Sequence, residues 1–517
     1  MSLGIFVQDD FKVKRNLTLN LGLRWSYFGP LYSKENNMYV ATPGVGANYL
    51  TGLVVSKRNS WNTQKNNFGP QIGFAWSPSK FNDKFVVRGG YGLNYNQEEI
   101  AISGSIAANP GLVVQPTFEM AAPNSPNPGI IYATSSSPTS LTGYPPNKNA
   151  VVTFGPNGLP VGGVGLNVGI FPHELPTMRV HHYSLDTQYD LGRQFVATVG
   201  YVGNVSHNIF FHQNPLATPA ASGFPINPQV GGGDYWSVIG HANYNALLAG
   251  LRHQFSHQFS ADAEFAWAKS LDTSSGPYFE QPYPFNVSYD YGRSDYDVSK
   301  AFKLIALWQP VFFHGSNHWM EKIAGGWSLS GIFTMHTGFP WSPISNTTTP
   351  GNLYCGNCFG YSQLYPAAFL GGAGTSTSND QFKMGSNYPK GGAAYFAAVP
   401  ACSATITTNC YTTFNGATSG GNANPPFPGV HRNSLNGPGY RALDATLVKA
   451  FGLPNLRGLG ENAKVEFRLD AYNVFNNLNF KNSGPGDIVN DINAAGFGRA
   501  QAALGGRVVT LGARFDF

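Results

Sequence analysis

The four cysteines carry the most specific chemistry in this 517-residue chain, and all of them fall within one stretch, residues 338–439. Cys355 and Cys358 form a Cys-x-x-Cys pair, and Cys402 and Cys410 follow. Four thiolates could bind zinc in a tetrahedral site, but the second spacing is wide for such a site. An even number of cysteines favours disulfides where a loop faces an oxidising compartment. We therefore predict two disulfides. The two sequence-local pairs are the simplest of the three possible connectivities.

Carboxylates and histidines offer two further candidate metal sites. Asp290, Asp295 and Asp297 could supply oxygen ligands to calcium, although their spacing is not that of an EF-hand. The alternative, which we favour, is that they accept hydrogen bonds within a loop. His314 and His318 stand four residues apart in a segment that we expect to be a turn, so we do not predict a metal site there.

An enzyme is not predicted. Ser77-Pro78-Ser79-Lys80 has the Ser-x-x-Lys spacing of acylases, but it occupies an expected hairpin turn and lacks the partner motifs. The chain contains no Gly-x-Ser-x-Gly and no phosphate-binding loop, and we predict no cofactor. The net charge of +5 is small and scattered, which excludes nucleic acid as an expected partner.

Charged residues also recur at alternate positions, opposite runs of apolar side chains. The nine that do so are Arg24, Arg88, Asp262, Glu264, Glu466, Arg468, Asp470, Arg514 and Asp516. An Arg or Lys that faces lipid at mid-membrane costs about 2–4 kcal/mol, so we predict that these charges face the lumen of a membrane β-barrel. They could form a wall of ion pairs that contacts a plug, which we favour, or they could line a substrate path.

The elements that carry these charges are amphipathic strands. In residues 507–517, Val509, Leu511 and Phe515 share one face, while the other face is mostly polar. Charged residues make up 11% of the chain, against about 25% in ordinary soluble domains, and aromatic residues make up 14%. Mean hydropathy is −0.18 and no apolar run is long enough for a transmembrane helix. A transmembrane β-barrel reconciles these observations, because only half of each strand faces lipid.

The pattern predicts an all-β, antiparallel barrel of thirteen strands in which short turns and long loops alternate. The expected strands are 4–13, 17–27, 68–77, 85–95, 180–191, 194–203, 244–255, 259–269, 300–311, 327–337, 440–451, 463–475 and 507–517. The expected long loops are about 28–67, 96–179, 204–243, 270–299, 338–439 and 476–504. Outer-membrane barrels have short periplasmic turns and long extracellular loops. A β-sandwich or a propeller would show other spacings.

The odd number of strands has its own implication. If the long loops are outside, the first and the last strand both descend towards the periplasm. A complete single-chain bacterial barrel normally has an even number of strands, so we expect at least one more strand before residue 1. The alternative is an additional strand near residues 208–212. The N-terminal sequence has no signal peptide.

Short phrases along nearly the whole chain resemble the C-terminal β-barrel of TonB-dependent receptors of the Oar-like type. They include Gln8-Asp9-Asp10-Phe11, Leu17-Thr18-Leu19-Asn20-Leu21-Gly22-Leu23-Arg24, Val87-Arg88-Gly89-Gly90-Tyr91-Gly92, Gly200-Tyr201-Val202-Gly203 and Phe467-Arg468-Leu469-Asp470-Ala471-Tyr472-Asn473-Val474-Phe475-Asn476. The resemblance implies a barrel of about 22 strands around an N-terminal plug. This chain has no counterpart of the plug or the TonB box.

The resemblance further implies a bacterial outer-membrane location and the import of a large nutrient, such as an oligosaccharide, a peptide or a metal chelate. TonB would act only through the missing N-terminal parts. Phe515 and Phe517 resemble the C-terminal signal that the barrel-assembly machinery recognises, and membrane lipid is the remaining expected partner. Two other functions stay open: a passive channel of about 14 strands, of the porin or fatty-acid-channel type, and a surface-binding or adhesion barrel.

Overall fold

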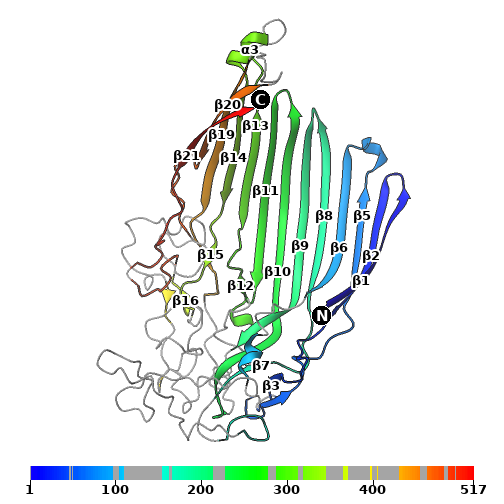
Figure 1. The fold of residues 1–517 in the computed structure, drawn as a ribbon, viewed down its shortest axis with the longest axis vertical. Helices are drawn as coiled ribbons and strands as arrows, with labels where there is room; N and C mark the ends of the chain where they lie inside the picture. The colour runs from blue at the N-terminus through cyan, green and yellow to red at the C-terminus, as the bar shows by residue number, and fades with distance from the viewer. Residues whose placement is uncertain are drawn as a thin grey trace.

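The computed structural model is nearly all β and contains one large antiparallel sheet (Figure 1). It describes residues 2–45, 48, 50–96, 104–109, 154–161, 166–213, 227–276, 287–312, 318–344, 365–370, 396–398, 405, 430–453, 463–481, 487–494 and 496–516. No helix in these residues is both long and apolar enough to cross a membrane.

Thirteen long strands form the body of the sheet within the described residues, and each pairs antiparallel with the next along the chain. They are β1 (Ser2–Lys14), β2 (Leu17–Phe28), β5 (Phe68–Trp76), β6 (Phe85–Asn96), β8 (Met178–Gly192), β9 (Phe195–Gln213), β10 (Val230–Ser256), β11 (Phe259–Asp272), β13 (Lys300–Trp308), β14 (Trp327–His336), β19 (Tyr440–Gly452), β20 (Lys464–Tyr472) and β21 (Val508–Asp516). The all-β, antiparallel prediction is therefore confirmed.

The two ends of the sheet differ. Strands meet through short turns at one end, the turn end, and through the long segments at the other, the loop end (Figure 1). Three turns are only two residues long, and in two of them both residues have positive φ: Arg193 and Gln194 at 51° and 65°, His257 and Gln258 at 48° and 69°. Positive φ at both central residues is typical of a type I′ turn, the mirror image of a type I turn, whose twist matches the right-handed twist of paired strands.

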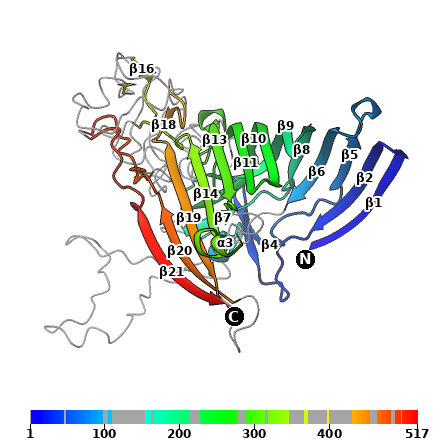
Figure 2. The same ribbon diagram turned by 90° about the horizontal axis from the view of Figure 1, so that it is seen from above.

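The sheet is open. Seen from above, its strands follow an arc from β1 to β21, and no ladder in the described residues joins these two strands (Figure 2). Both strands run from the loop end to the turn end, so the edges of the sheet point in the same direction (Figure 1). An antiparallel pair between β1 and β21 is therefore geometrically impossible.

The predicted loop at 204–243 is wrong in extent. β9 continues to Gln213 and β10 begins at Val230, so most of that segment is paired strand. The period-2 apolar pattern fails there because these extensions are held by packing among loops rather than by contact with lipid. Trp236 and Phe211, for example, are 1% and 0% exposed. Residues 208–212 belong to β9 and do not form an additional strand.

The long segments at the loop end contain short strands and small cores of their own. β3 (Tyr39–Thr42), β4 (Val54–Lys57) and β7 (Leu166–Ile170) pack with the extensions of β9 and β10. Two buried apolar clusters lie there; they comprise Ala41, Leu50, Leu53, Val55, Leu159, Val168, Ile170 and Val230, and Val40, Trp61, Ile106, Phe171, Leu175, Phe210 and Trp236. A third cluster joins Trp341, Phe396, Val430, Leu435, Ile488, Ile492 and Phe497. The third cluster is thus shared between the largest long segment and residues 488–497 of the last one.

The segment expected to be a turn between β13 and β14 contains a short helix, α3 (His318–Ala324). Seven residues are too few for a helical period to be recognised in a sequence. The strands beside it hold the helix in place. Trp327 Nε1 donates a hydrogen bond to the Ala324 carbonyl oxygen at 3.0 Å, which satisfies one acceptor at the helix end.

Candidate functional site on the polar face of the sheet

The ladder register places all nine of the alternating charges on the same face of the sheet, which we call the polar face. Residues that lie directly opposite each other on paired strands share a face. Following these pairs from strand to strand, from β2 with β5 to β20 with β21, places Arg24, Arg88, Asp262 and Asp516 on one face. The opposite, apolar face carries side chains such as Leu21, which is 44% exposed, and Leu511, which is 80% exposed.

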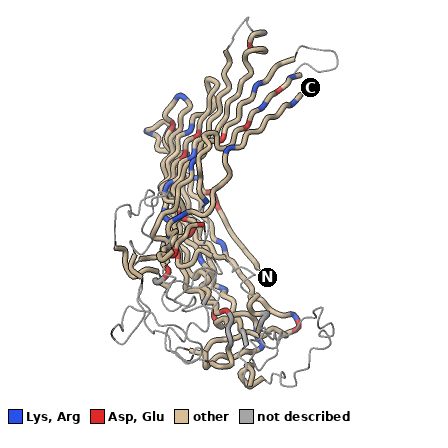
Figure 3. The backbone as a smooth tube through the Cα atoms, turned by 90° about the vertical axis from the view of Figure 1, so that its left-hand side faces the viewer, with Lys and Arg blue, Asp and Glu red and all other residues tan. Residues whose placement is uncertain are grey.

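Most charges on the C-terminal half of the polar face are paired within hydrogen-bond distance. The Arg252 guanidinium contacts the Asp262 carboxylate at 2.6–2.8 Å, and Arg468 Nε lies 2.8 Å from Asp470. Lys464 binds Glu466 at 2.5 Å and lies 3.6 Å from Asp516, which also accepts from Arg514. The cationic partners are about half exposed or more. Exposed pairs contribute little to stability, so they make a hydrated, nearly neutral wall. Charged residues are sparse along the strands in general (Figure 3).

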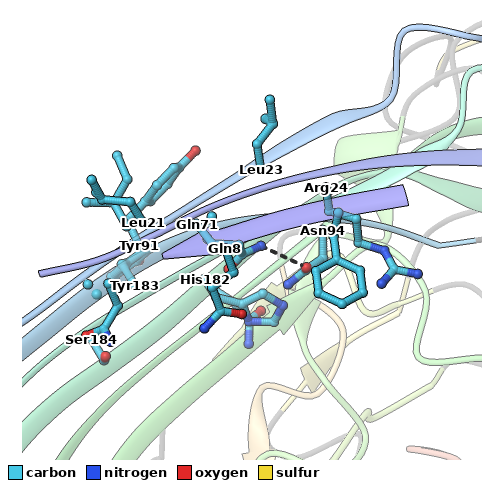
Figure 4. A pocket seen from close by; sticks show the side chains of 18 of the residues that line it. Gln8, Leu21, Leu23, Arg24, Gln71, Tyr91, Asn94, His182, Tyr183 and Ser184 are labelled. Atoms are coloured by element: carbon cyan, nitrogen blue, oxygen red, sulfur yellow. Dashed lines mark hydrogen bonds between the residues drawn. The ribbon is translucent and has the colours of Figure 1, made fainter. Parts of the chain in front are cut away.

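A groove of about 810 Å³ is hollowed into the N-terminal half of this face, across β1, β2, β5, β6, β8, β9 and β10. Its polar lining is mostly amide and hydroxyl; it includes Gln8, Asn20, Gln71, Asn94, His182, Ser184, Asn204 and Tyr244. In Figure 4, Leu21 and Leu23 point away from the side on which Gln8 and His182 lie. The groove therefore offers amide, hydroxyl and imidazole groups that donate and accept hydrogen bonds, with one guanidinium, that of Arg24.

Gln71 is the side chain around which the groove is arranged. Its Nε2 donates to Asn94 Oδ1 at 3.1 Å and to the Leu93 carbonyl oxygen at 3.2 Å (Figure 4). Its cross-strand partners on both sides are glycines, Gly22 and Gly92. A Cβ at Gly92 would overlap the Gln71 amide. The glycines thus leave the space in which this long amide lies flat on the sheet.

The described residues bring together no group of three His, Cys, Asp or Glu side chains that could hold a metal ion. Amides, hydroxyls and isolated imidazoles bind neutral polar groups by hydrogen bonding. The groove thus offers hydrogen-bonding groups to a polar partner.

A second concentration of polar groups is buried at the loop end, where residues 430–436 of the largest loop meet residues 272–297. The Arg432 guanidinium, which is not exposed to solvent, contacts the Asp272 carboxylate and donates to the Arg293 carbonyl oxygen at 3.0 Å. Asn433 donates to that same oxygen at 2.8 Å and to Asp295 Oδ1 at 2.6 Å. We call this network the clasp, because it joins two long loops.

The acidic residues considered for calcium belong to the clasp. Asp297 accepts from the Ser270 backbone N–H at 2.7 Å and from Arg293 Nε at 2.7 Å. Asp290 accepts from the Tyr365 hydroxyl at 2.8 Å. Burial raises the pKa of Asp290 to about 7, against the opposing effects of Arg432 and of the Tyr365 hydrogen bond. All three carboxylates thus accept hydrogen bonds, Asp290 and Asp295 from the largest loop and Asp297 from its own segment.

Several predicted site residues lie outside the described residues: Cys355, Cys358, Cys402, Cys410, His314 and Phe517. Phe515 is described and lies on the apolar face opposite Val465. Sequence reasoning missed Arg432 and Gln71. Arg432 stands in a Gly- and Pro-rich stretch without periodicity, so nothing in the sequence indicated that it is buried. Gln71 could have been found as the one long polar side chain between glycines on facing strands.

Comparison with known proteins identifies the family. The outer membrane beta barrel domain matches residues 1–510. No curated protein sequence matches the chain. Similar solved structures include the outer membrane transporter YddB from Escherichia coli, with 10% identity, a TM-score of 0.48, and coverage of 99% of this chain and 44% of that one. The siderophore receptor PiuA from Acinetobacter baumannii is 10% identical, with a TM-score of 0.40, and coverage is 99% and 42%.

The ferripyoverdine receptor of the outer membrane of Pseudomonas aeruginosa is also 10% identical, with a TM-score of 0.43 and coverage of 100% of this chain and 38% of that one. The chain therefore spans less than half the length of these structures. Similarity at this level supports no inference about function. The family match covers nearly the whole chain and agrees with the antiparallel sheet and its two unlike faces. The chain thus belongs to the outer membrane β-barrel domain family and is located in the bacterial outer membrane.

Proposed function

We propose that these thirteen strands form part of a larger barrel of the TonB-dependent receptor class, and that the protein imports a large nutrient such as an oligosaccharide, a peptide or a metal chelate. The observation that carries this proposal is the open sheet, whose two edge strands, β1 and β21, run in the same direction. In a purely antiparallel barrel at least one more strand must stand between them.

Unpaired edges are costly in a membrane. Each backbone N–H or C=O that faces hydrocarbon without a partner costs several kcal/mol. β1 has thirteen residues and β21 has nine, so both edges expose long rows of such groups. Further strands that close the barrel remove this cost, and the phrases that resemble Oar-like receptors point to the class of barrel that supplies them.

Within such a receptor, the polar face lines the lumen and the loop end faces the outside. The groove around Gln71 then contacts a plug or a passing ligand, and the loops joined by the clasp form the outer rim where a nutrient first binds. Energy coupling through TonB belongs to parts of the receptor outside these strands. Phe515, together with Phe517, serves the barrel-assembly machinery.

Barrel closure can be tested by cross-linking. Cysteines are placed at Val7 of β1 and Leu511 of β21, after the four native cysteines are replaced by serine, and a short bismaleimide is applied to the protein in outer membranes. We expect no cross-link between 7 and 511. The control pair is 469 and 511, because Leu469 and Leu511 are direct partners on β20 and β21, and it should cross-link efficiently.

A cross-link between 7 and 511 as efficient as in the control would show that the strands close on themselves, and would overturn the proposal. The planar-bilayer conductance of the protein purified at its native length tests independently whether the barrel is plugged or open. A plugged receptor is expected to be closed. Stable, uniform open channels would instead support the passive channel.

A further inference from the structure

Near the loop end, the apolar face carries basic side chains and tyrosines. There, Tyr95, Arg179, His207 and His241 form one continuous row of direct cross-strand partners from β6 to β10. His181 lies on the same face two residues beyond Arg179, and Lys269 lies there as the partner of Asn245. Arg179, His181, His207, His241 and Lys269 together form what we call the basic belt.

The side chains around the basic belt are tyrosines and amides. The Tyr91 hydroxyl lies 2.7 Å from His181 Nδ1, and the His241 ring lies 4.9 Å from the Tyr291 ring. Tyr183 and Tyr201 donate to Asn245 Oδ1 at 2.8 and 2.7 Å. An apolar ring with a polar tip suits the depth of lipid headgroups. Farther along the same strands the face is aliphatic and aromatic, as at Leu185 and Phe265.

Within the part of the chain that the structure describes, Arg179 and Lys269 of the belt meet no carboxylate. Both side chains are exposed. The paired rows that contain the belt hold no Asp or Glu. This contrasts with the polar face, where Arg252, Arg468 and Arg514 each meet a carboxylate. At headgroup depth a cation on the lipid-facing wall costs about 1 kcal/mol or less, and an anionic lipid headgroup there supplies a partner for it.

We propose that the basic belt binds the phosphate groups of a phosphorylated glycolipid of the outer leaflet, the class to which lipid A belongs. The inference rests on the part of the proposed function that places the loop end outside. Strands lie about 4.8 Å apart and rise about 3.3 Å per residue, so Arg179 on β8 and Lys269 on β11 are offset by about 14 Å across the strands and by about 13 Å along them. A row of donors of this width engages more than one phosphate, and Arg and Lys form strong charge-assisted hydrogen bonds to each.

The test uses the protein purified from outer membranes and delipidated in a neutral detergent. Native mass spectrometry measures binding of bisphosphorylated lipid A, with fully dephosphorylated lipid A and phosphatidylglycerol as the other probes. Each cation near a membrane surface contributes about 1 kcal/mol. We therefore expect the double variant Arg179→Gln/Lys269→Gln to bind bisphosphorylated lipid A about tenfold or more weakly than the natural protein does. Dephosphorylated lipid A should bind equally weakly to both.

The matched control is Arg88→Gln/Lys303→Gln, which removes the same charge from the polar face. It should leave lipid A binding unchanged, and both variants should keep the heat-modifiable gel shift of a folded barrel. Equal loss in the control, no loss in the belt variant, or equally tight binding of phosphatidylglycerol would each overturn the proposal. None of these outcomes bears on barrel closure, which is tested by the cross-link between β1 and β21.

Discussion

At the scale of single residues, Asp290 shows how the packing of loops changes the pKa of a buried carboxyl group. Its side chain is 1% exposed, and its Oδ1 accepts from the Tyr365 hydroxyl, while Arg432 lies close enough to favour the ionised form. Burial outweighs both effects, and its pKa is raised to about 7. Ionised Asp290 is a poorly compensated buried charge, because Arg432 is already engaged by Asp272.

This pKa makes the clasp sensitive to pH. Asp290 has an ordinary pKa of 3.8 when the loops open, and about 7 when they close. The closed state therefore holds the extra proton. Its stabilising contribution is complete below pH 4 and is lost as the pH rises through 7. Between pH 8 and pH 6 the opening equilibrium of residues 430–436 should fall about tenfold, since one pH unit on one group is worth about 1.4 kcal/mol.

Hydrogen–deuterium exchange at the two pH values, corrected for the intrinsic rate, measures this change. Asp290→Asn keeps the hydrogen bond from Tyr365 and removes the titration, so its opening should be independent of pH in this range. If the clasp of the natural protein opened equally at pH 6 and pH 8, Asp290 would not titrate between these pH values. The same would follow if Asp290→Asn kept the pH dependence.

At the scale of elements, the strands could be predicted from the sequence where lipid contacts one face. β2 is the clearest case, because Leu19, Leu21 and Leu23 alternate with Asn20 and Arg24 without interruption. The ends of β9 and β10 could not be predicted. Their side chains are buried by other loops on both faces, so the period-2 pattern disappears while the backbone ladder continues.

Lys449 is another element-scale feature that the sequence did not reveal. It lies on the apolar face between its partners Trp327 and Phe467. Its ammonium donates to the Ile323 carbonyl oxygen at 2.9 Å and to that of Gly325, at the end of α3. The negative end of the helix thus neutralises a cation on the lipid-facing wall. This contact joins α3 to Lys449 of β19, more than a hundred residues later in the sequence.

Two glycines of the sheet should respond oppositely to substitution by alanine. A Cβ at Gly69 of β5 would overlap the Leu93 carbonyl oxygen, whereas one at Gly512 of β21 meets nothing within 4 Å. Gly69→Ala must shift backbone and should destabilise the protein by about 1–3 kcal/mol. Gly512→Ala should be neutral or stabilise slightly, because glycine is unfavourable in a strand.

The midpoint temperature of the heat-modifiable gel shift reports both changes in the same membrane-extracted protein. We expect a clearly lower midpoint for Gly69→Ala and an unchanged or higher one for Gly512→Ala. The close contact between β5 and β6 at Gly69 would be contradicted if the two variants melted at the same temperature.

At the scale of the whole molecule, the alternation of short turns and long loops predicted both the antiparallel order and the shared direction of the two edge strands. The loop-end cores could not be predicted. Leu50, Leu159 and Val230 are distant in sequence, and they meet in one cluster only because strands bring their loops to the same end of the sheet. The groove was missed for a similar reason, since Gln71 and His182 become neighbours only through the ladder.

The central claim is that one face of this sheet meets lipid and the other lines a water-filled interior. It is tested most directly by spin labels placed singly at positions 19 to 24 of β2, in outer membranes and without native cysteines. Relative accessibility to oxygen and to a water-soluble nickel complex should alternate with a period of two. Oxygen should dominate at 19, 21 and 23, and nickel at 20, 22 and 24. Accessibility without alternation, or with the opposite phase, would contradict the account.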